Sequence, residues 1–418
     1  MKIGMVNSMR NAVIAQSGGP TVAINASLAG VLKYNLENNI FDNVYGALNG
    51  ITGILENRYL NLTDKINEID DFIEKLKLTP AMYLGSCRYK MPLPEDKPEI
   101  YETIFTFFKQ HDIDAFFYIG GNDSMDTVDR LSKYAEKIGS NINIIGVPKT
   151  IDNDLVHIDH TPGFGSAAKY VATSILEMAH DTYIYHVKSV TIIEIMGRDA
   201  GWLTAASALA RNEYSMAPHL IYLPEADFDA KECVSDVKAL LEKQDDVVIA
   251  ISEGIRDKDG NYISAAESKL DKFGHMQLSG AGKALEHYIA NEIGCKVRSV
   301  ELNILQRCAT HSASLIDLDE SVKLGETACR LAKEGQTGLM ATLTRTSNVP
   351  YSVVYDGHPV SEIANGVKKV PREWINDRGN DVTEKMINYL KPLILGEPDI
   401  KYVEGMPQYL DVTHLIKK

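Results

Sequence analysis

The chain repeats one hydrophobic pattern along most of its length: a short apolar run, a polar or glycine-rich break, and then a stretch with helical spacing. Near-continuous apolar strands that alternate with helices are typical of parallel sheets covered on both faces. The pattern therefore predicts a doubly wound α/β fold. Seven strands are expected, over residues 12–16, 115–119, 143–147, 190–195, 219–223, 247–251 and 297–302.

Each expected strand is followed by a polar break. In chain order, the breaks are SGGP, GGNDS, PKTIDND, MGRDAG, PE, SEG and QR. Because ligands bind beyond the carboxyl ends of the strands in open α/β sheets, we expect one crevice lined by all these breaks. The best-defined helix is expected over 166–183, where apolar residues recur at helical spacing and Ser166 stands near the start.

Length and composition limit the possible classes of protein. A chain of 418 residues is too long for one ordinary core, so two or three domains are expected. The net charge of −14 disfavours nucleic acid and anionic membranes as partners, but it leaves small anionic substrates open. There is no apolar run long enough to span a membrane, and the N-terminus lacks a signal-peptide core.

Cysteine and histidine usage gives no sign of disulfides or of a zinc site. The five cysteines form no CxxC pair, which favours reduced thiols, and we expect a cytoplasmic protein. The only closely spaced histidines are His157 and His160 in HIDH. We interpret them as loop polarity rather than as metal ligands.

The SGGP break has the features of an anion-binding turn. Gly18 and Gly19 let main-chain N–H groups approach an anion, and Pro20 is expected to start a helix whose N-terminus adds positive potential. The break matches neither GxGxxG nor GxxxxGK[ST], so the dinucleotide-binding and Walker-type motifs are absent. Taken alone, the turn is equally typical of a plain strand-to-helix connection.

The GGNDS break repeats this arrangement and adds a carboxylate. Asp123 beside a glycine turn suits a Mg²⁺ ion held partly through water, because Mg²⁺ prefers hard oxygen ligands. The alternative is that Asn122 or Ser124 caps the next helix with its side chain. The two roles are compatible, so both stay open.

The PKTIDND break holds groups that are costly to bury without a function. A lysine ammonium such as Lys149 beside Mg²⁺ neutralises a transferring phosphoryl group, and an aspartate accepts the proton of a substrate hydroxyl. In an extended segment, Asp152 and Asp154 would point the same way. Cations at other breaks suit a substrate with more than one phosphate group; they are Arg88, Arg198, Arg298 and Arg307.

Seven motifs in one order resemble those of the phosphofructokinase family. They are SGGP, LGSCR, GGNDS, PKTIDND, MGR, SEG and VRSVELNILQR. The resemblance implies two Rossmann-like α/β domains with the active site in the cleft between them. The phosphoryl-donor domain is expected at 1–165 plus 306–360, and the sugar-phosphate domain at 166–305 plus 361–418. Residues 311–418 exceed a minimal member of the family, and their role stays open.

Two positions resemble the pyrophosphate-dependent branch of the family. ATP-dependent members usually carry GGDGS and PGTIDND, whereas this chain has Asp123 and Lys149 in place of two glycines. Asp123 would obstruct the α-phosphate of a nucleotide, and Lys149 would supply a cation to the short, highly charged pyrophosphate. The resemblance implies reversible phosphoryl transfer from pyrophosphate to the 1-hydroxyl of fructose 6-phosphate, with Mg²⁺ as cofactor.

The resemblance also implies a role for each matching residue. Asp152 would be the base, supported by Thr150 and Asp154. Lys149 and Asp123 complete the catalytic set, and Asn122 and Asp123 would bind the metal. The residues expected to hold substrates are Gly19, Arg88, Thr150, Ile151, Met196, Gly197, Arg198, Glu253, Arg298 and Arg307. Within this set, Gly19 and Arg88 would hold pyrophosphate, and Arg298 would reach into the site of a neighbouring subunit. The expected assembly is therefore a homodimer or homotetramer with shared sites.

Three alternatives remain at the level of sequence. The first is an ATP-dependent phosphofructokinase of the same fold, which Lys149 and Asp123 disfavour. The second is a regulatory paralogue without activity, supported only by three departures from the family pattern, at Asn122, Ser189 and Ile304. The third keeps the chemistry but uses another acceptor, such as a seven-carbon ketose phosphate.

Overall fold

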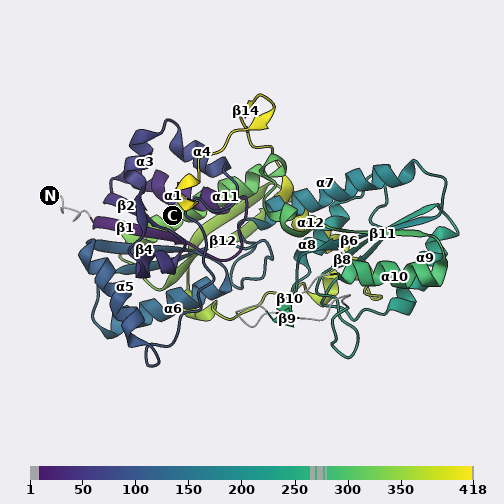
Figure 1. Cartoon of the computed structure of the whole chain (residues 1–418), viewed down its shortest axis with the longest axis horizontal. Helices are drawn as coiled ribbons and strands as arrows, with labels where there is room; N and C mark the ends of the chain where they lie inside the picture. The colour runs from purple at the N-terminus through teal and green to yellow at the C-terminus, as the bar shows by residue number, and fades with distance from the viewer. Residues whose placement is uncertain (1–8, 264–268, 271–275, 278–279, 417–418) are drawn as a thin grey trace.

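The computed structural model of the chain describes residues 9–263, 269–270, 276–277 and 280–416. It has two lobes, each built around its own sheet (Figure 1). All seven predicted strands are present, and the predicted α/β class is confirmed. No helix within these described ranges is both long and apolar enough to cross a membrane.

The first lobe contains a seven-stranded sheet of order β13-β12-β5-β4-β1-β2-β3. Its centre is parallel, while β3 and β13 are antiparallel edge strands. The middle of β1 and β4 is fully buried, which explains why these strands read as continuous apolar runs. The strands are β1 (Met9–Gln16), β2 (Phe41–Ala47), β3 (Tyr59–Asn61), β4 (Ile113–Gly120), β5 (Asn143–Pro148), β12 (Leu339–Asn348) and β13 (Tyr351–Pro359).

A helix from late in the sequence completes the first lobe. Helix α11 packs along α1, and both have a glycine at the crossing: a Cβ atom on Gly30 would lie 2.0 Å from the Val322 oxygen, and one on Gly325 would lie 2.1 Å from the Ser27 oxygen. The helices of this lobe are α1 (Ile24–Asn38), α2 (Ile51–Leu55), α3 (Leu62–Glu68), α4 (Phe72–Leu78), α5 (Pro98–Gln110), α6 (Asn122–Lys137) and α11 (Leu315–Lys333).

The second lobe contains a four-stranded parallel sheet of order β11-β6-β8-β7. Its strands are β6 (Ser189–Ile195), β7 (Leu220–Tyr222), β8 (Asp246–Ser252) and β11 (Lys296–Glu301). Its helices are α7 (Phe164–Tyr183), α8 (Trp202–Ala206), α9 (Ala230–Leu241), α10 (Ala281–Ile293) and α12 (Glu384–Leu390).

Short elements connect and extend the lobes. Two small hairpins pair β9 (Lys269–Leu270) with β10 (Met276–Gln277) and β14 (Tyr402–Val403) with β15 (Met406–Pro407). The 3₁₀ helices are η1 (Ser207–Ala210), η2 (Asn303–Arg307), η3 (Thr310–Ser312), η4 (Val360–Glu362), η5 (Arg372–Trp374), η6 (Lys391–Ile394) and η7 (Thr413–Leu415).

The start of α7 differs from the expectation that Ser166 would begin this helix. The helix begins at Phe164, and the Asp317 carboxylate of α11 satisfies its first N–H groups. The main-chain N–H groups of Gly163 and Ser166 donate to Asp317 at 2.9 and 3.0 Å, and the Ser166 hydroxyl donates to it at 2.5 Å. The cap thus comes from a helix of the other lobe, a contact that local sequence does not reveal.

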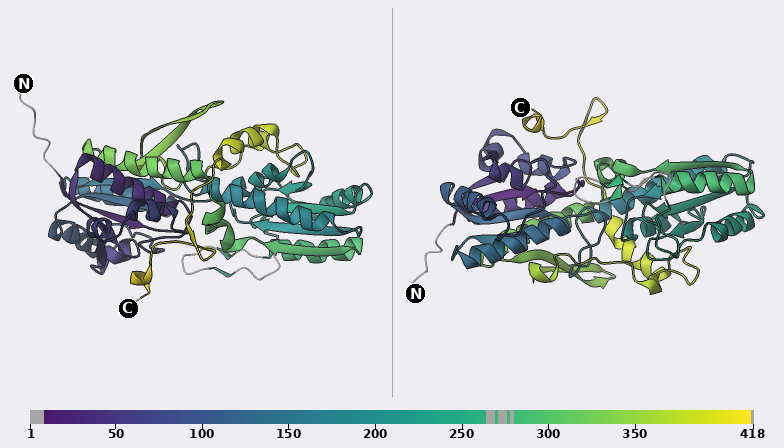
Figure 2. Two further views of the ribbon diagram at one scale, coloured as in Figure 1. Left: turned by 90° about the horizontal axis from the view of Figure 1, so that it is seen from above. Right: turned by 60° about the horizontal axis from the view of Figure 1, so that its bottom comes forward.

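The C-terminal segment does not remain in the second lobe. Residues 370–394 pack into the second lobe, as expected, but Leu410 packs against the core of the first. The Leu410 N–H donates to Thr79 Oγ1 at 3.0 Å, and His414 Nε2 lies 2.7 Å from the Tyr83 main-chain oxygen. Figure 2 shows this end of the chain running back along the first lobe. The expected assignment of all of 361–418 to the second lobe is therefore wrong at both ends, since Ile363 also packs in the core of the first lobe.

Candidate active site

A pocket of about 420 Å³ is lined by residues of both lobes. Five of the seven polar breaks meet there: those after β1, β4, β5, β6 and β8. The PE break after β7 does not line the pocket, because the Glu225 carboxylate instead accepts the N–H groups of Gly201 and Val370. The lining residues are Ser17, Gly18, Gly19, Cys87, Arg88, Tyr89, Lys90, Tyr118, Gly121, Asn122, Asp123, Ser124, Lys149, Thr150, Asp152, Asp154, Arg198, Asp199, Ala200 and Glu253.

Ten of the residues singled out from sequence line this pocket. They are Gly19, Arg88, Asn122, Asp123, Lys149, Thr150, Asp152, Asp154, Arg198 and Glu253. Arg307 lies at its margin, since a Cβ atom on Gly19 would be 3.3 Å from Arg307 Nη1. The Arg307 cation also acts on the pKa of Asp152.

Besides Arg307, four of the predicted residues are not part of the lining. Ile151 is buried in the core of the second lobe, and the Met196 N–H faces Gln306 Oε1 at 3.4 Å. Gly197 supports the lining indirectly, because its N–H donates to Glu253 Oε1 at 3.3 Å. Arg298 lies elsewhere on the second lobe, and its Nη1 is 3.5 Å from the carboxylate of Asp181.

The SGGP turn binds a lysine of the PKTIDND break. Gly18 has φ +78°, and a Cβ atom there would lie 3.2 Å from Lys149 Nζ. Lys149 Nζ donates to the Gly19 main-chain oxygen at 2.7 Å. The expectation that Pro20 starts the next helix is wrong: α1 begins at Ile24, whose N–H is capped by Thr21 Oγ1 at 3.0 Å.

The GGNDS turn runs directly into α6. A Cβ atom on Gly120 would lie 1.9 Å from Ser124 Oγ, so this position requires glycine. Neither Asn122 nor Ser124 caps the helix, which starts at Asn122 itself. Instead, Asn122 Nδ2 donates to Asp154 Oδ2 at 3.2 Å, and this contact joins two polar breaks.

Burial shifts the pKa values of the charged groups in the PKTIDND break. Burial lowers the pKa of Lys149 to about 8, and the Asp152 carboxylate opposes that change. Burial raises the pKa of Asp152, while Lys149 and two arginines oppose the rise. Burial and then the charge of Asp152 raise the pKa of Asp154 to about 7. Perturbed groups gathered in one pocket are typical of a catalytic site.

The two aspartates reach the pocket through a turn rather than through an extended strand. Asn153, between them, has φ +55°, so the expected extended conformation is wrong. The Asp152 N–H donates to Thr150 Oγ1 at 3.1 Å, which fixes the start of the turn. Both carboxylates nevertheless line the pocket.

Several lining residues were missed by sequence reasoning. Lys90 could have been predicted from sequence, because this cation follows Arg88 by two residues in LGSCRYK. Tyr118 belongs to an apolar strand, so the sequence gives no sign that it lines a pocket. Asp199 lies in the MGRDAG break, but nothing in the sequence distinguishes it from an ordinary surface aspartate. The missed residues are Ser17, Cys87, Tyr89, Lys90, Tyr118, Gly121, Ser124, Asp199 and Ala200, whereas Gly18 belongs to the SGGP turn that was expected to approach an anion.

The pocket has oxygen donors that fit a hard metal ion. Asn122 Oδ1 is buried without a hydrogen-bond partner among the described residues, and the Asp123 and Asp154 carboxylates line the same pocket. Carboxylate and amide oxygens are ligands that Mg²⁺ prefers. Arg198 Nε and Arg307 Nε are also buried without partners in the described ranges, a state that suits groups facing an anion.

The histidines of HIDH lie outside the pocket. His160 is buried with its ring nitrogens against Asp159 and Glu320, so the loop-polarity interpretation is wrong for this residue. His157 approaches His358 and Glu362 closely enough to suggest a metal site. However, the two imidazole rings are stacked 4.2 Å apart with only 13° between their planes. The nitrogen lone pairs of the two rings therefore lie in nearly parallel, separate planes, an arrangement that does not favour binding one ion.

Known proteins are similar to this chain over most of its length. The family model described as phosphofructokinase matches residues 11–331. The pyrophosphate–fructose 6-phosphate 1-phosphotransferase of Halomonas elongata is 41% identical over 404 residues, which cover 96% of this chain and 96% of that protein. The protein of the same name from Methylococcus capsulatus is 37% identical, with coverage of 97% and 96%.

A solved structure is similar over nearly the whole chain. The pyrophosphate-dependent phosphofructokinase from Nitrosospira multiformis has a TM-score of 0.86 and 35% sequence identity, and the match covers 96% of each chain. The similarity therefore includes both lobes and the C-terminal region beyond residue 331. On these grounds, the chain belongs to the phosphofructokinase family.

Proposed function

We propose that this protein transfers a phosphoryl group from pyrophosphate to the 1-hydroxyl of fructose 6-phosphate, giving fructose 1,6-bisphosphate and phosphate. This step belongs to glycolysis and, in reverse, to gluconeogenesis. The names of full-length relatives support the proposal. The observation that carries it is the buried ammonium of Lys149, which lies against the SGGP turn in the same pocket as Asp152.

The chemistry follows from the charges in the pocket. The sugar O1 attacks the transferred phosphorus, the bond from that phosphorus to the bridging oxygen breaks, and phosphate leaves. Asp152 accepts the proton of the 1-hydroxyl as general base, and returns it in the reverse reaction. Lys149 compensates the negative charge that moves to the leaving phosphate. Asp154, with its raised pKa of about 7, supports Asp152.

We assign the two substrates to different sides of the pocket. Gly19 and Arg88, from the first lobe, hold pyrophosphate, while Arg198 and Glu253, from the second lobe, hold fructose 6-phosphate. Arg307 stands at the margin of the pocket and acts electrostatically on Asp152. By this assignment, the first lobe binds the phosphoryl donor and the second lobe binds the sugar phosphate.

We propose Mg²⁺ as the cofactor. Asn122 Oδ1 and the Asp123 carboxylate would hold the ion, and the unpartnered buried oxygen of Asn122 supports this assignment. When bound, Mg²⁺ neutralises part of the pyrophosphate charge. Asp123 has a second consequence, because a carboxylate in the first turn of α6 repels the longer phosphate chain of a nucleotide.

We further propose that the protein is cytoplasmic and works as a homodimer or homotetramer. Arg298 supports the shared-site model, since it does not line the pocket of its own chain and its side chain is 42% exposed. A cation in this position is available to a second copy. Its partner within the chain is Asp181, in the last part of α7.

The decisive experiment is a product assay on the purified protein with fructose 6-phosphate, Mg²⁺ and either pyrophosphate or ATP. Fructose 1,6-bisphosphate should form rapidly with pyrophosphate and scarcely with ATP. Equal or faster formation with ATP would overturn the assignment of the donor. Turnover of a seven-carbon ketose phosphate ahead of fructose 6-phosphate would overturn the assignment of the acceptor.

A further inference from the structure

The segment that carries Asp152 and Asp154 is held from behind by one lysine of the C-terminal region. Lys368 Nζ lies 2.7 Å from the Asp159 main-chain oxygen and 3.2 Å from that of Ile158. It also lies 3.1 Å from Asn153 Oδ1. In addition, the Lys368 N–H donates to the Asp154 main-chain oxygen at 2.7 Å. One residue therefore contacts this loop at four points.

Asn153 is the central point of this arrangement. It is fully buried and has φ +55°, so it makes the turn between the two aspartates. Its Oδ1 accepts from the Thr161 N–H at 3.1 Å as well as from Lys368, and its Nδ2 donates to the Tyr389 hydroxyl at 2.9 Å. Since the side chain is bound on both sides, its orientation fixes the turn and the directions of both neighbouring carboxylates.

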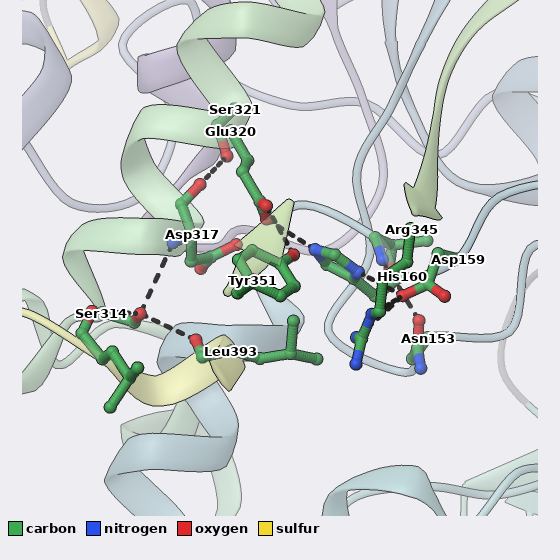
Figure 3. A network of polar contacts seen from close by, with 12 residues as sticks. Asn153, Asp159, His160, Ser314, Asp317, Glu320, Ser321, Arg345, Tyr351 and Leu393 are labelled. Atoms are coloured by element: carbon green, nitrogen blue, oxygen red, sulfur yellow. Dashed lines mark hydrogen bonds and ion pairs between the residues drawn. The ribbon is translucent and has the colours of Figure 1, made fainter. Parts of the chain in front are cut away.

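A buried ionic network holds the far end of the same loop (Figure 3). The Asp159 carboxylate contacts His160 Nδ1 at 2.8 Å and Arg345 Nη2 at 2.8 Å. His160 Nε2 lies 2.5 Å from the Glu320 carboxylate, which also accepts the Tyr351 hydroxyl at 2.6 Å. Burial alone would lower the pKa of His160, but the two carboxylates raise it above its ordinary value. The loop is thus anchored to α11 and to β12 and β13 of the first lobe.

Burying the ammonium of Lys368 at this position costs free energy. Its ammonium has no ion-pair partner within 4 Å in the described ranges, and burial lowers its pKa to about 8. Its three N–H donors are matched by three neutral oxygens of the loop. Burying a charge gives little net stability compared with well-packed apolar residues. The match between donors and loop oxygens therefore indicates a role in the geometry of the site.

We propose that Lys368 is a positioning residue for the phosphoryl transfer: it holds the turn at Asn153 so that Asp152 and Asp154 face the pocket. The inference rests on the proposed function, because it assigns those aspartates to catalysis. It also gives the C-terminal region, which lies beyond the matched family model, a part in the reaction. Lys368 itself touches no substrate.

The test compares Lys368→Met with Lys369→Met. Methionine keeps the length of the side chain but removes the charge and all three donors, and Lys369 is an exposed neighbour. Because misplacing a catalytic group by about 1 Å costs on the order of 10²-fold, kcat of Lys368→Met should fall by roughly 10- to 100-fold. KM for both substrates should stay within about twofold of wild type. Lys369→Met should behave as wild type.

A second pair of measurements separates positioning from stability. Added ethylamine should restore part of kcat in Lys368→Ala, because a free amine can reoccupy the three acceptors. If Lys368→Met does not fold, Tyr389→Phe takes its place: it removes one contact to Asn153 and should lower kcat by a smaller factor at unchanged KM. A folded Lys368→Met or Tyr389→Phe with wild-type kcat would overturn the inference. Absence of turnover with pyrophosphate in the wild type would instead contradict the proposed function.

Discussion

The ammonium of Lys149 donates a hydrogen bond of 2.7 Å to the main-chain oxygen of Gly19, a residue 130 positions earlier in the chain. The contact joins the break after β5 to the break after β1, and the lysine is only 2% exposed. Burial lowers its pKa to about 8, so the ammonium form predominates at pH 7, and the nearby Asp152 stabilises that charge. A glycine at position 149 would remove both the charge and the contact.

The first prediction follows from this contact. Lys149→Met should lower kcat/KM for pyrophosphate by roughly 10²-fold, since removing one preorganised donor to a developing charge typically costs about 10²- to 10³-fold. The exposed residue Lys133, in α6, provides the control, because Lys133→Met removes a cation of the same lobe without touching the pocket. Steady-state rates at saturating fructose 6-phosphate measure the effect, and equal losses in both variants would refute a specific role.

The second prediction concerns the choice of donor. Asp123 lies in the first turn of α6 and lines the pocket. Asp123→Gly should raise the ratio of kcat/KM for ATP to kcat/KM for pyrophosphate, because it removes a negative charge and a side chain from the path of a nucleotide. Both constants should be measured at the same free Mg²⁺ concentration. An unchanged ratio would show that Asp123 does not select the donor.

The third prediction concerns sharing between subunits. Arg298→Ala should raise KM for fructose 6-phosphate without changing the thermal stability, since the ion pair of Arg298 with Asp181 is exposed and contributes little. Arg298→Ala and Asp152→Ala subunits should each be poorly active alone. Mixed oligomers should regain activity, because one site then has wild-type Asp152 and receives a wild-type Arg298. Lack of complementation, with subunit exchange verified by mass spectrometry, would exclude a shared site.

The fourth prediction uses the raised pKa of Glu253. Burial, more than any nearby charge, raises this pKa from 4.5 to about 7. A carboxyl group with a higher pKa in the folded than in the unfolded chain stabilises the fold fully below pH 4.5, and this contribution is lost as the pH rises through 7. At pH 8 the ionised Glu253 should therefore cost on the order of 2 kcal/mol, after allowance for partial solvent screening.

Glu253→Gln removes that cost but keeps an oxygen for the Gly197 N–H. The free energy of unfolding of the variant should exceed that of wild type at pH 8, and the difference should shrink strongly at pH 5. Urea unfolding at both pH values, without substrates, gives the comparison. A difference that does not depend on pH would mean that the pKa of Glu253 is ordinary.

Seven strands were predictable from sequence because each reads as an apolar run, and all of them except the half-exposed β11 are largely buried. Four strands of the first sheet, β2, β3, β12 and β13, escaped this reasoning: β3 is only three residues long, and exposed or half-exposed positions are frequent in the other three. About half of the pocket lining was also predictable, because the breaks follow parallel strands and gather at the carboxyl edge of each sheet. Contacts across long sequence separations were not predictable. The sequence around Asp317 does not show that its carboxylate caps α7, and the sequence around Lys368 does not show that its ammonium binds Asn153.

The last prediction concerns the base. Asp152→Asn keeps the size of the side chain and one acceptor oxygen, but it removes the basicity. General-base assistance typically contributes about 10²- to 10⁴-fold, so kcat should fall within that range while KM for fructose 6-phosphate changes little. The reverse reaction should fall in parallel, because the same carboxyl group must return the proton.

The matched control is Asp199→Asn, which changes another carboxylate of the same pocket. Asp199 already pairs with Arg256 Nη2 at 2.8 Å, so its replacement should have a much smaller effect on kcat. If Asp152 served only to shape the turn after Thr150, asparagine would substitute for it and both directions would keep near-normal rates. In that case Asp154, whose pKa of about 7 suits a base at neutral pH, becomes the residue to replace next.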